Sequence, residues 1–467
     1  MQLLLIYFII FLLFMSSRGS SLLRPVSAFG SRLYRRQQKQ NAFRLHNTAV
    51  AYDCDTASKD ESATVANLEP YFSIYYNGES SDKNNEIVLR SFNPLITSCR
   101  SHGMRLHILS SDVWEVDMPP GHRFPMSKYK KVRKAVQAYI HNAEQQIQCD
   151  FRVSPLATFD QLSTTHCSEY ITRYLSGKMT AEENRNIGFP WTMQHVNRTL
   201  SSAGGTVAAA VDAYEEYLKR QQHHDNGQTD NVHLCWSAHV AGGTHHAFRD
   251  YGEGFCIFSD IAVAANVLLQ KFPYQPLTAN PTKQSKGIRR ILIIDLDVHQ
   301  GNGNAALFQG NDKVQTFSVH CRSNYFSKKE KSDLDIELPP GCTDETYLTT
   351  LKHWLRRIED HPFDDDNDQL ETQGQKPFDF IFYQAGVDIH KDDRLGRLSI
   401  TQEGISRRNH LVFDFAHRMR APLVICMGGG YPKSDDWTPI LTAHAGVYIE
   451  AHQYLSSLKT GANEMHK

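Results

Sequence analysis

The sequence predicts an α/β protein with a single domain built on a central, mostly parallel sheet that has helices on both faces. Runs of branched aliphatic residues such as Ile291–Ile294 are typical of strands buried on both faces. Segments with helical periodicity separate these runs, and this alternation favours a parallel sheet. The roughly 400 residues that follow position 70 would allow two or three domains, but no long Gly/Ser/Pro linker interrupts them.

The amino-terminal segment has the composition of a targeting sequence. Residues 1–15 are apolar except for Gln2, and this run is shorter than the roughly 20 residues that span a bilayer. We interpret residues 1–28 as a signal peptide and residues 29–52, which are basic and lack acids, as a transit-peptide-like segment. This arrangement resembles the two-part plastid presequences of diatoms and related algae. Plastid delivery is therefore expected, with a secretory signal or an amino-terminal membrane anchor as the alternatives.

Composition restricts the classes of function. Without residues 1–52 the chain keeps 43 basic and 51 acidic residues, a formal charge of −8. This charge argues against direct nucleic-acid binding, which needs clustered positive charge. Nine dispersed cysteines without a CxxC pair indicate free thiols in a reducing compartment. We expect no stable membrane span in the mature chain, and the oligomeric state is left open.

The rest of the chain divides into a linker, a catalytic domain and a tail. Residues 53–70 are polar and form the expected linker, residues 71–455 the domain, and residues 456–467 the tail. Strands are predicted at Tyr71–Tyr76, Arg105–Leu109, Arg289–Asp297, Gln315–His320, Phe378–Gln384 and Leu423–Met427.

Three helices are predicted between these strands. Lys128–Gln148 has apolar residues at helical spacing and Ser127 as a plausible cap. Gly204-Gly205 is expected to open a helix over Thr206–Leu218, and a glycine-containing loop precedes the third helix at Phe258–Leu269. Polar runs that cannot bury apolar area predict surface insertions at Gln221–Asn231, Pro273–Lys286 and Asp360–Lys376.

Metal-ligand side chains follow the most apolar strand. Because side chains alternate along an extended segment, Asp295, Asp297 and His299 point to one side and could share one ion. A solvated polar strand end is the alternative. Adjacent histidines at His245-His246, a strand-end carboxylate at Asp388 and a tyrosine at Tyr431 follow other glycine turns or strands. In a parallel sheet such groups gather at the carboxyl ends of the strands, where ligands bind.

Four motifs in order, GGTHHAF, IIDLDVHQGNGN, YQAGVDIHKDDRLGRLSIT and GGGY, resemble the zinc-dependent histone deacetylase family on the arginase/deacetylase fold. The resemblance covers roughly residues 70–450. It is closest to class IV and its bacterial and plant relatives, through GHRFPMSKY, HQGNG and KSDLDIELPPG. It implies a zinc-dependent amide hydrolase that removes acetyl or longer acyl groups from protein lysines.

The resemblance also implies roles for single residues. One Zn²⁺ would be held by Asp297, His299 and Asp388, with water in the open position. His246 would be the general base beside His245, and Tyr431 would donate to the developing oxyanion.

Further residues would support these groups. Asp295 would orient His245, and Asn302, which replaces an Asp of class I relatives, would orient His246. Asp295, Asp297, the His299 carbonyl and Ser318 resemble the family's structural cation site, for which we expect K⁺. Substrate-binding residues implied by the resemblance are Gly254, Phe255, Tyr325, Phe326 and Gly429, and Ser327 stands where close relatives have Pro.

Three other functions are weighed against this interpretation. A two-metal arginase-like enzyme would need carboxylates at positions occupied by Gly301 and Gly386. An inactive acyl-lysine-binding module would be expected to have lost a catalytic group, and none is missing. Hydrolysis of acetylpolyamines or another small amide remains open. The expected partner is thus an acyl-lysine protein or peptide, or an acetylated small amine.

Overall fold

The computed structural model describes residues 104–143, 147–224, 234–276, 287–324, 328–360 and 377–464, without the side chains of 222–224 and 459–464. The predicted presequence, the linker and the strand Tyr71–Tyr76 lie outside these residues, as do Tyr325, Phe326, Ser327 and most of the three predicted insertions. Those interpretations, and the domain boundaries, stay predictions.

The described residues form one eight-stranded sheet in which every pairing is parallel. Its spatial order is β2-β1-β3-β8-β7-β4-β5-β6, and the predicted α/β class is confirmed. The strands are β1 Arg105–Ser110, β2 Gln148–Val153, β3 Trp236–Val240, β4 Ile291–Asp295, β5 Val314–Cys321, β6 Leu334–Leu338, β7 Phe380–Gln384 and β8 Leu423–Cys426.

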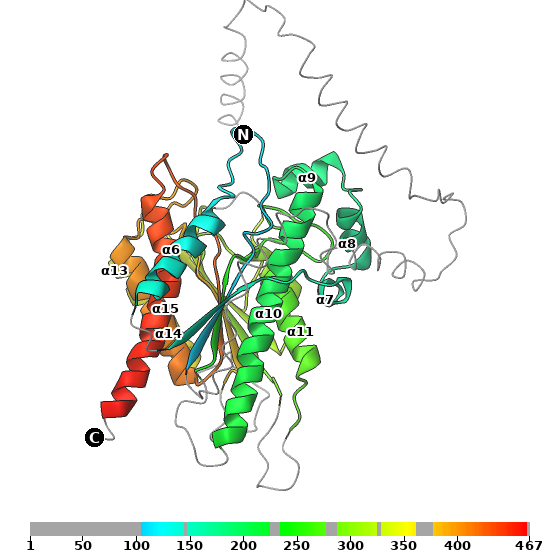
Figure 1. The fold of residues 1–467 in the computed structure, drawn as a ribbon. Helices are drawn as coiled ribbons and strands as arrows, with labels where there is room; N and C mark the ends of the chain where they lie inside the picture. The colour runs from blue at the N-terminus through cyan, green and yellow to red at the C-terminus, as the bar shows by residue number, and fades with distance from the viewer. Residues whose placement is uncertain are drawn as a thin grey trace, which may run out of the picture. The chain divides into compact units, whose positions relative to one another are not determined.

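Helices cover both faces of the sheet (Figure 1). One layer consists of α6 Lys128–Asn142, α13 Asp344–Asp360, α14 Gln402–Met419 and α15 Thr438–Glu464. The opposite layer contains α7 Phe159–Ser163, α8 Ser168–Leu175, α9 Ala181–Ile187, α10 Met193–His224 and α11 Asp260–Lys271, while α12 Asn302–Phe308 packs beside β5. No helix in the described part of the chain is both long and apolar enough to span a bilayer.

The central strand β4 explains its own composition. Ile291–Ile294 is at most 1% exposed because helices cover both faces and β5 and β7 flank it. A strand in this position has no solvent-facing side, so its residues are continuously apolar rather than alternating. Asp295 ends the strand, opposite Ser318 on β5 and Gln384 on β7.

Several predicted boundaries are wrong. The helix from Lys128 ends at Asn142 rather than Gln148, where β2 begins, and Ser127 makes no side-chain cap bond. The strands β2, β3 and β6 escaped prediction because β2 and β6 are polar edge strands and β3 carries Ser237 and His239 among its apolar residues. The strand predicted to reach Asp297 ends at Asp295, and α11 starts at Asp260 with Ser259 as its cap.

The Gly204-Gly205 pair does not open a helix, because it lies inside the 32-residue helix α10. A Cβ added to Gly204 would lie 2.3 Å from the carbonyl oxygen of Pro155. One added to Gly205 would lie 2.4 Å from Nε2 of His239. The two glycines therefore permit close packing of α10 against the sheet, which offsets their low helix propensity.

Candidate active site

Four neighbouring strands at the centre of the sheet, β3, β8, β7 and β4, deliver the predicted site residues. Since all strands are parallel, the loops after their carboxyl ends lie at the same edge of the sheet. The loop after β3 carries His245 and His246, the loop after β4 carries Asp297 and His299, and Asp388 follows β7. Tyr431 and its preceding glycines follow β8.

The three predicted metal ligands are assembled in the structure. One ligand atom from each of Asp297, His299 and Asp388 lies within 4.8 Å of the others. Nδ1 of His299 is 3.2 Å from Oδ1 of Asp297 and 3.3 Å from Oδ2 of Asp388. Among the described residues, Oδ2 of Asp388 has no hydrogen-bond partner although it is buried. Two carboxylates and one imidazole with an unsatisfied buried oxygen fit a divalent cation such as Zn²⁺.

The pKa values of the residues in this cluster also fit a bound cation. Burial, and then the charge of Asp297, raise the pKa of Asp388 to about 8. Burial alone would lower the pKa of His299, but its hydrogen bond with Asp297 and the nearby charges of Asp388 and Asp297 raise it to about 10. Two buried carboxyl groups this close repel each other when both are ionised, and a bound cation relieves that repulsion.

Backbone amides hold the ligand carboxylates in place. Oδ1 of Asp388 accepts a hydrogen bond from the backbone N–H of Val298 at 2.8 Å, and Oδ2 of Asp297 accepts one from that of Gly429 at 2.8 Å. A Cβ on Gly429 would lie 2.2 Å from Oδ2 of Asp388. Gly429, predicted as a substrate-binding residue, thus lies directly against the ligand cluster, and only glycine fits there.

The two histidines have different partners. Nδ1 of His245 is 2.7 Å from Oδ2 of Asp295, and Nδ1 of His246 is 2.9 Å from Oδ1 of Asn302. Burial lowers the pKa of His245, but Asp295 and Asp297 more than offset this effect and raise it to about 9. Burial, reinforced by the neighbouring His245, holds the pKa of His246 well below its ordinary value. His246 is therefore the neutral member of the pair at pH 7, as a general base must be.

Tyr431 is anchored by its backbone and surrounded by rings. Its backbone N–H donates to Oδ2 of Asp393 at 2.5 Å. Burial raises the pKa of its hydroxyl well above the usual value, so the hydroxyl keeps its proton and can donate it in a hydrogen bond. The ring centroids of Phe124 and Phe255 both lie 6.2 Å from that of Tyr431.

Phe255 anchors an aromatic cluster beside the tyrosine. Its φ of 68° is in the left-handed region, which is rare for a bulky residue, and its backbone N–H donates to the carbonyl of Ile187 at 2.7 Å. Gly254, with φ 57°, completes this turn. Phe255 packs against Phe124 and Phe189 at centroid distances of 5.1 and 5.2 Å. Of the two predicted wall residues, the ring of Phe255 therefore lies near that of Tyr431, and Gly254 precedes it in the turn.

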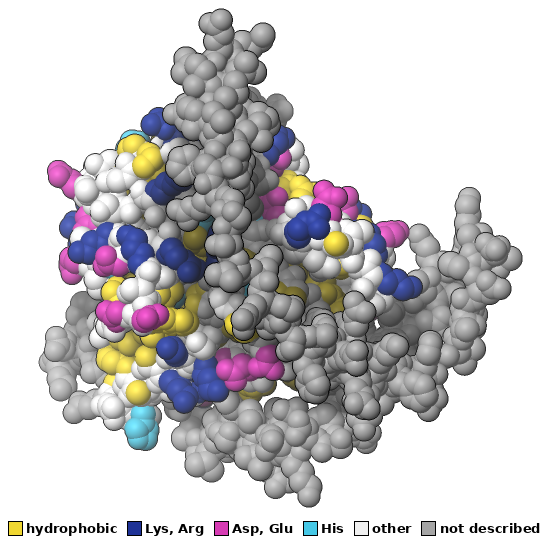
Figure 2. All heavy atoms as spheres, turned by 90° about the horizontal axis from the view of Figure 1, so that it is seen from above, with side chains coloured by type: hydrophobic (Ala, Val, Ile, Leu, Met, Phe, Trp, Pro, Cys, Tyr) yellow, Lys and Arg dark blue, Asp and Glu magenta, His cyan; other side chains and the backbone are white. Residues whose placement is uncertain are grey.

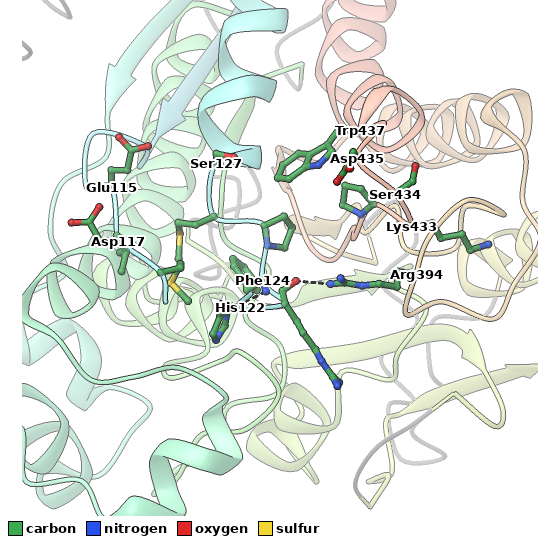
Figure 3. A pocket seen from close by; sticks show the side chains of 16 residues that line it. Glu115, Asp117, His122, Phe124, Ser127, Arg394, Lys433, Ser434, Asp435 and Trp437 are labelled. Atoms are coloured by element: carbon green, nitrogen blue, oxygen red, sulfur yellow. Dashed lines mark hydrogen bonds between the residues drawn. The ribbon is translucent and has the colours of Figure 1, made fainter. Parts of the chain in front are cut away.

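Phe124 also lines an open pocket of about 550 Å³ (Figure 3). Glu115 and Asp117 line one side, while Arg394 lies on the other and donates to the carbonyl of Arg123 at 2.5 Å. Figure 2 shows Lys/Arg and Asp/Glu side chains interspersed on the visible face, without dominance of one sign. The pocket is thus lined by side chains of both charges.

The structure also tests the two-metal alternative. A Cβ on Gly301 would lie 2.3 Å from Oδ2 of Asp295, and one on Gly386 would lie 2.4 Å from Oδ2 of Asp297. Neither position has room for the additional carboxylate that a second metal would require. Within the described residues, Asp297, His299 and Asp388 are also the one cluster with metal-ligand spacing.

Two of the residues predicted for the structural cation site, Asp295 and Ser318, lie on neighbouring strands. Ser318 lies opposite Asp295 in the β4–β5 register, and its Oγ is 2.9 Å from Nδ1 of His320. Oδ1 of Asp295 accepts the backbone N–H of Asp297 at 3.1 Å.

Three residues near the site were not singled out from the sequence. Lys128 is buried beneath the glycine turn, with Nζ 3.3 Å from the carbonyl of Gly428 and 5.1 Å from the ring centroid of Tyr431. Glu253 accepts from the side-chain amide of Asn302 at 2.7 Å. Asp393 holds the backbone of Tyr431. All three belong to motifs or loops that the sequence did single out, GHRFPMSKY, the loop before Phe258 and VDIHKDDRLG, but spacing alone does not reveal their contacts.

Comparisons with known proteins agree with this geometry. Residues 122–446 match the histone deacetylase domain model. An uncharacterized protein of Picosynechococcus sp. is 37% identical over 319 residues, 68% of this chain and 89% of that protein. Histone deacetylase 2 of Arabidopsis thaliana is 31% identical over 202 residues, which are 43% of this chain and 45% of that protein. A solved HDAC homologue complexed with SAHA has a TM-score of 0.52 at 21% identity, covering 76% of this chain and 84% of that one, and supports the fold.

Proposed function

This chain belongs to the histone deacetylase domain family, and from that premise we propose that it is a zinc-dependent hydrolase that removes acetyl or longer acyl groups from lysine side chains of proteins. The observation that carries the proposal is the meeting of three groups at one edge of the sheet. A cation-binding triad, a buried histidine pair and a buried tyrosine hydroxyl are the parts that amide hydrolysis needs.

Asp297, His299 and Asp388 would hold the zinc ion. Zn²⁺ bound there supplies Lewis acidity, both to the substrate carbonyl and to a water molecule. Two of the three ligands are anionic and weaken that acidity relative to three imidazoles, so the base provided by the chain matters more.

His246 is the proposed base. Because its Nδ1–H donates to Oδ1 of Asn302 at 2.9 Å, Nε2 carries the lone pair and is the atom that accepts a proton from water. The same atom would later return that proton to the departing lysine amine. His245, whose Nδ1–H donates to Asp295, carries positive charge at pH 7 and stabilises negative charge that develops beside it.

Tyr431 is the proposed oxyanion donor. Its hydroxyl is protonated and buried, so it forms its hydrogen bond without competition from bulk water. Asp393 fixes the tyrosine backbone, and the rings of Phe124 and Phe255 limit its side-chain positions. The same rings would form an apolar wall along an acyl-lysine side chain.

The substrate class is proposed from the pocket beside Phe124 and from the sequence motifs. The pocket beside Phe124 is lined by both acidic and basic side chains. These side chains favour a polypeptide substrate over a small amine, because they could bind residues that flank the acyl-lysine. The motifs HQGNG and KSDLDIELPPG resemble those of class IV enzymes, and this resemblance supports the inclusion of longer acyl groups in the proposal. The second candidate, hydrolysis of acetylpolyamines, would use the same catalytic residues.

A substrate panel tests these alternatives. Purified protein is assayed with acetyl-, short-acyl- and myristoyl-lysine peptides and with acetylated polyamines, with and without a chelator. We expect hydrolysis of peptides that the chelator abolishes and added Zn²⁺ restores. Turnover of polyamines alone would favour the second candidate, and no turnover of any substrate would contradict the proposed activity.

Two further proposals rest on the sequence. We propose K⁺ as a structural ion at Asp295, Asp297, the His299 carbonyl and Ser318, to be tested by thermal unfolding in K⁺ against a large organic cation. We also propose plastid delivery by residues 1–52. Fusion of these residues to a fluorescent protein tests this, and retention in the secretory pathway would contradict it.

A further inference from the structure

A buried chain of hydrogen bonds connects the core to the loop that carries His245 and His246. It begins at the hydroxyls of Ser111 and Ser154, which are 2.9 and 3.0 Å from Nε2 of His239. It continues from Nδ1 of His239 to Thr206 at 2.9 Å and from Thr206 to Oδ2 of Asp260 at 2.5 Å. These five residues are each at most 2% exposed.

The Asp260 carboxylate at the end of this series of hydrogen bonds determines which group donates in each of them. The Asp260 carboxylate accepts, so the single hydroxyl proton of Thr206 points to Oδ2 of Asp260. The oxygen of Thr206 must then accept from Nδ1–H of His239, which leaves Nε2 of His239 as the acceptor for a serine hydroxyl. Burial lowers the pKa of His239 to about 3, in agreement with this neutral form.

Asp260 is the first residue of α11 and binds the backbone of the histidine-bearing loop. Its Oδ2 accepts the backbone N–H of Gly243 at 3.0 Å, and its Oδ1 accepts that of Thr244 at 2.7 Å. Gly242 and Gly243 have φ of 75° and 80°, so the chain reverses here just before His245. The carboxylate therefore constrains the turn from which both catalytic histidines project.

The space for this chain is created by glycine. A Cβ on Gly205 would lie 2.4 Å from Nε2 of His239 and 2.5 Å from Oγ of Ser154. A Cβ on Gly242 would lie 2.4 Å from Oδ2 of Asp260 and 2.8 Å from Oγ1 of Thr206. Two glycines on separate elements thus leave room for polar atoms in the core. Burying these polar atoms costs desolvation free energy that apolar side chains in the same space would not.

We propose that Thr206 is a positioning residue for catalysis, which acts by directing Asp260 onto the Gly243–Thr244 backbone and so setting the position of His245 and His246. The catalytic part of this inference rests on the proposed function. A displacement of about 1 Å at a reacting group can cost about a hundredfold in rate, so a small loosening of the turn has a large kinetic effect.

The test compares variants at one atom. Thr206→Val removes the hydroxyl while keeping the side-chain shape, and Thr206→Ser keeps the hydroxyl. The control is Thr316→Val, since Thr316 on β5 is also buried and donates to a carboxylate, that of Asp333, at 2.9 Å. All are purified with zinc and examined by hydrogen exchange of the segment 241–247 and by kinetics on the preferred acyl-lysine peptide.

Hydrogen exchange needs no substrate and is read first. We expect Thr206→Val to accelerate exchange of the Gly243 and Thr244 amides by about tenfold or more, while Thr206→Ser and Thr316→Val leave it near wild type. If the exchange rate in Thr206→Val is unchanged, Thr206 does not direct Asp260 onto the Gly243–Thr244 backbone, and this result would overturn the proposal even if the protein hydrolyses no acyl-lysine. The outcome therefore does not depend on the proposed activity.

Kinetics then test the consequence for catalysis. We expect Thr206→Val to lower kcat by about tenfold or more with KM within about twofold and zinc content unchanged, and Thr206→Ser to restore most of kcat. Equal losses in Thr206→Val and Thr316→Val, or a loss that serine does not restore, would overturn the positioning role. If Thr206→Val does not fold, Thr206→Cys replaces it, because a thiol is a weaker donor of similar size. We expect the kcat of Thr206→Cys to be lower than that of Thr206→Ser. Full wild-type activity in Thr206→Cys would count against the proposal.

Discussion

Asn302 lies between His246 and Glu253, and the change Asn302→Asp alters both contacts. Its side-chain oxygen is 2.9 Å from Nδ1 of His246, while its amide donates to Oε1 of Glu253 at 2.7 Å. A carboxylate there would attract protonated His246, but it would also face Glu253, which is only 9% exposed. The single variant sets these effects against each other. The double variant Asn302→Asp/Glu253→Gln isolates the attraction, because glutamine can donate to the new carboxylate.

The size of the effect follows from Coulomb's law. Opposite unit charges about 4 Å apart interact by about 4 kcal/mol at an effective dielectric constant of about 20. This energy corresponds to about three pH units in a titration midpoint, and nearby opposite charges typically move such midpoints by about one to three. Protonated His246 is therefore stabilised in the double variant, and we expect its pKa to rise by about one to three units.

The assay is the pH dependence of kcat/KM, which reports groups of the free enzyme. A general base must be neutral, so activity is lost as the pH falls through the pKa of His246. Burial holds that pKa well below its ordinary value in the wild type. We expect the acid limb to move upward by about one to three pH units in the double variant, less in Asn302→Asp, and little in Glu253→Gln. An unmoved limb in a zinc-loaded double variant would refute the assignment of His246 as base.

Three further results are expected. Tyr431→Phe should lower kcat by about a hundred- to a thousandfold while zinc stays bound, measured by elemental analysis; unchanged hydrolysis would contradict the oxyanion role. Wild-type protein should retain one equivalent of zinc and Asp388→Ala much less, whereas two equivalents in the wild type would contradict the single-metal site. Burial lowers the pKa of His239 from 6.5 to about 3, so between these pH values the unfolded chain binds more protons and the wild type loses stability as the pH falls. In urea unfolding, its advantage over His239→Asn should shrink from pH 7 to pH 4, and a constant advantage would show that His239 is not held neutral.

The fold class could be predicted because β4 reports its surroundings directly. A run such as Ile291–Ile294 has no polar alternation, since both of its faces are covered, and only a sheet between two helical layers provides that environment. Edge strands lack this property. For that reason β2 and β6 were missed, while the central strands β4, β7 and β8 were found to within about two residues at each end.

The site could be predicted in the same measure. Asp297 and His299 were predicted to share one side of an extended strand, but β4 ends at Asp295 and both residues lie in the bends that follow it. They still meet, with Nδ1 of His299 3.2 Å from Oδ1 of Asp297. Asp388 joins them only because β7 lies next to β4 in a parallel sheet. The spacing of residues along the chain does not contain that adjacency, and the family motifs supplied it.

By itself the sequence determined the fold class and predicted which residue types would hold a metal or act in catalysis, because local periodicity and short motifs encode them. Only the tertiary structure decided what Gly205, Thr206 and Asp260 do. Their partners lie tens of residues away, so Gly205, which in isolation indicates a helix start, makes room inside α10 for His239. Contacts between distant segments depend on how elements pack, and packing is set by the whole chain at once rather than by any local pattern.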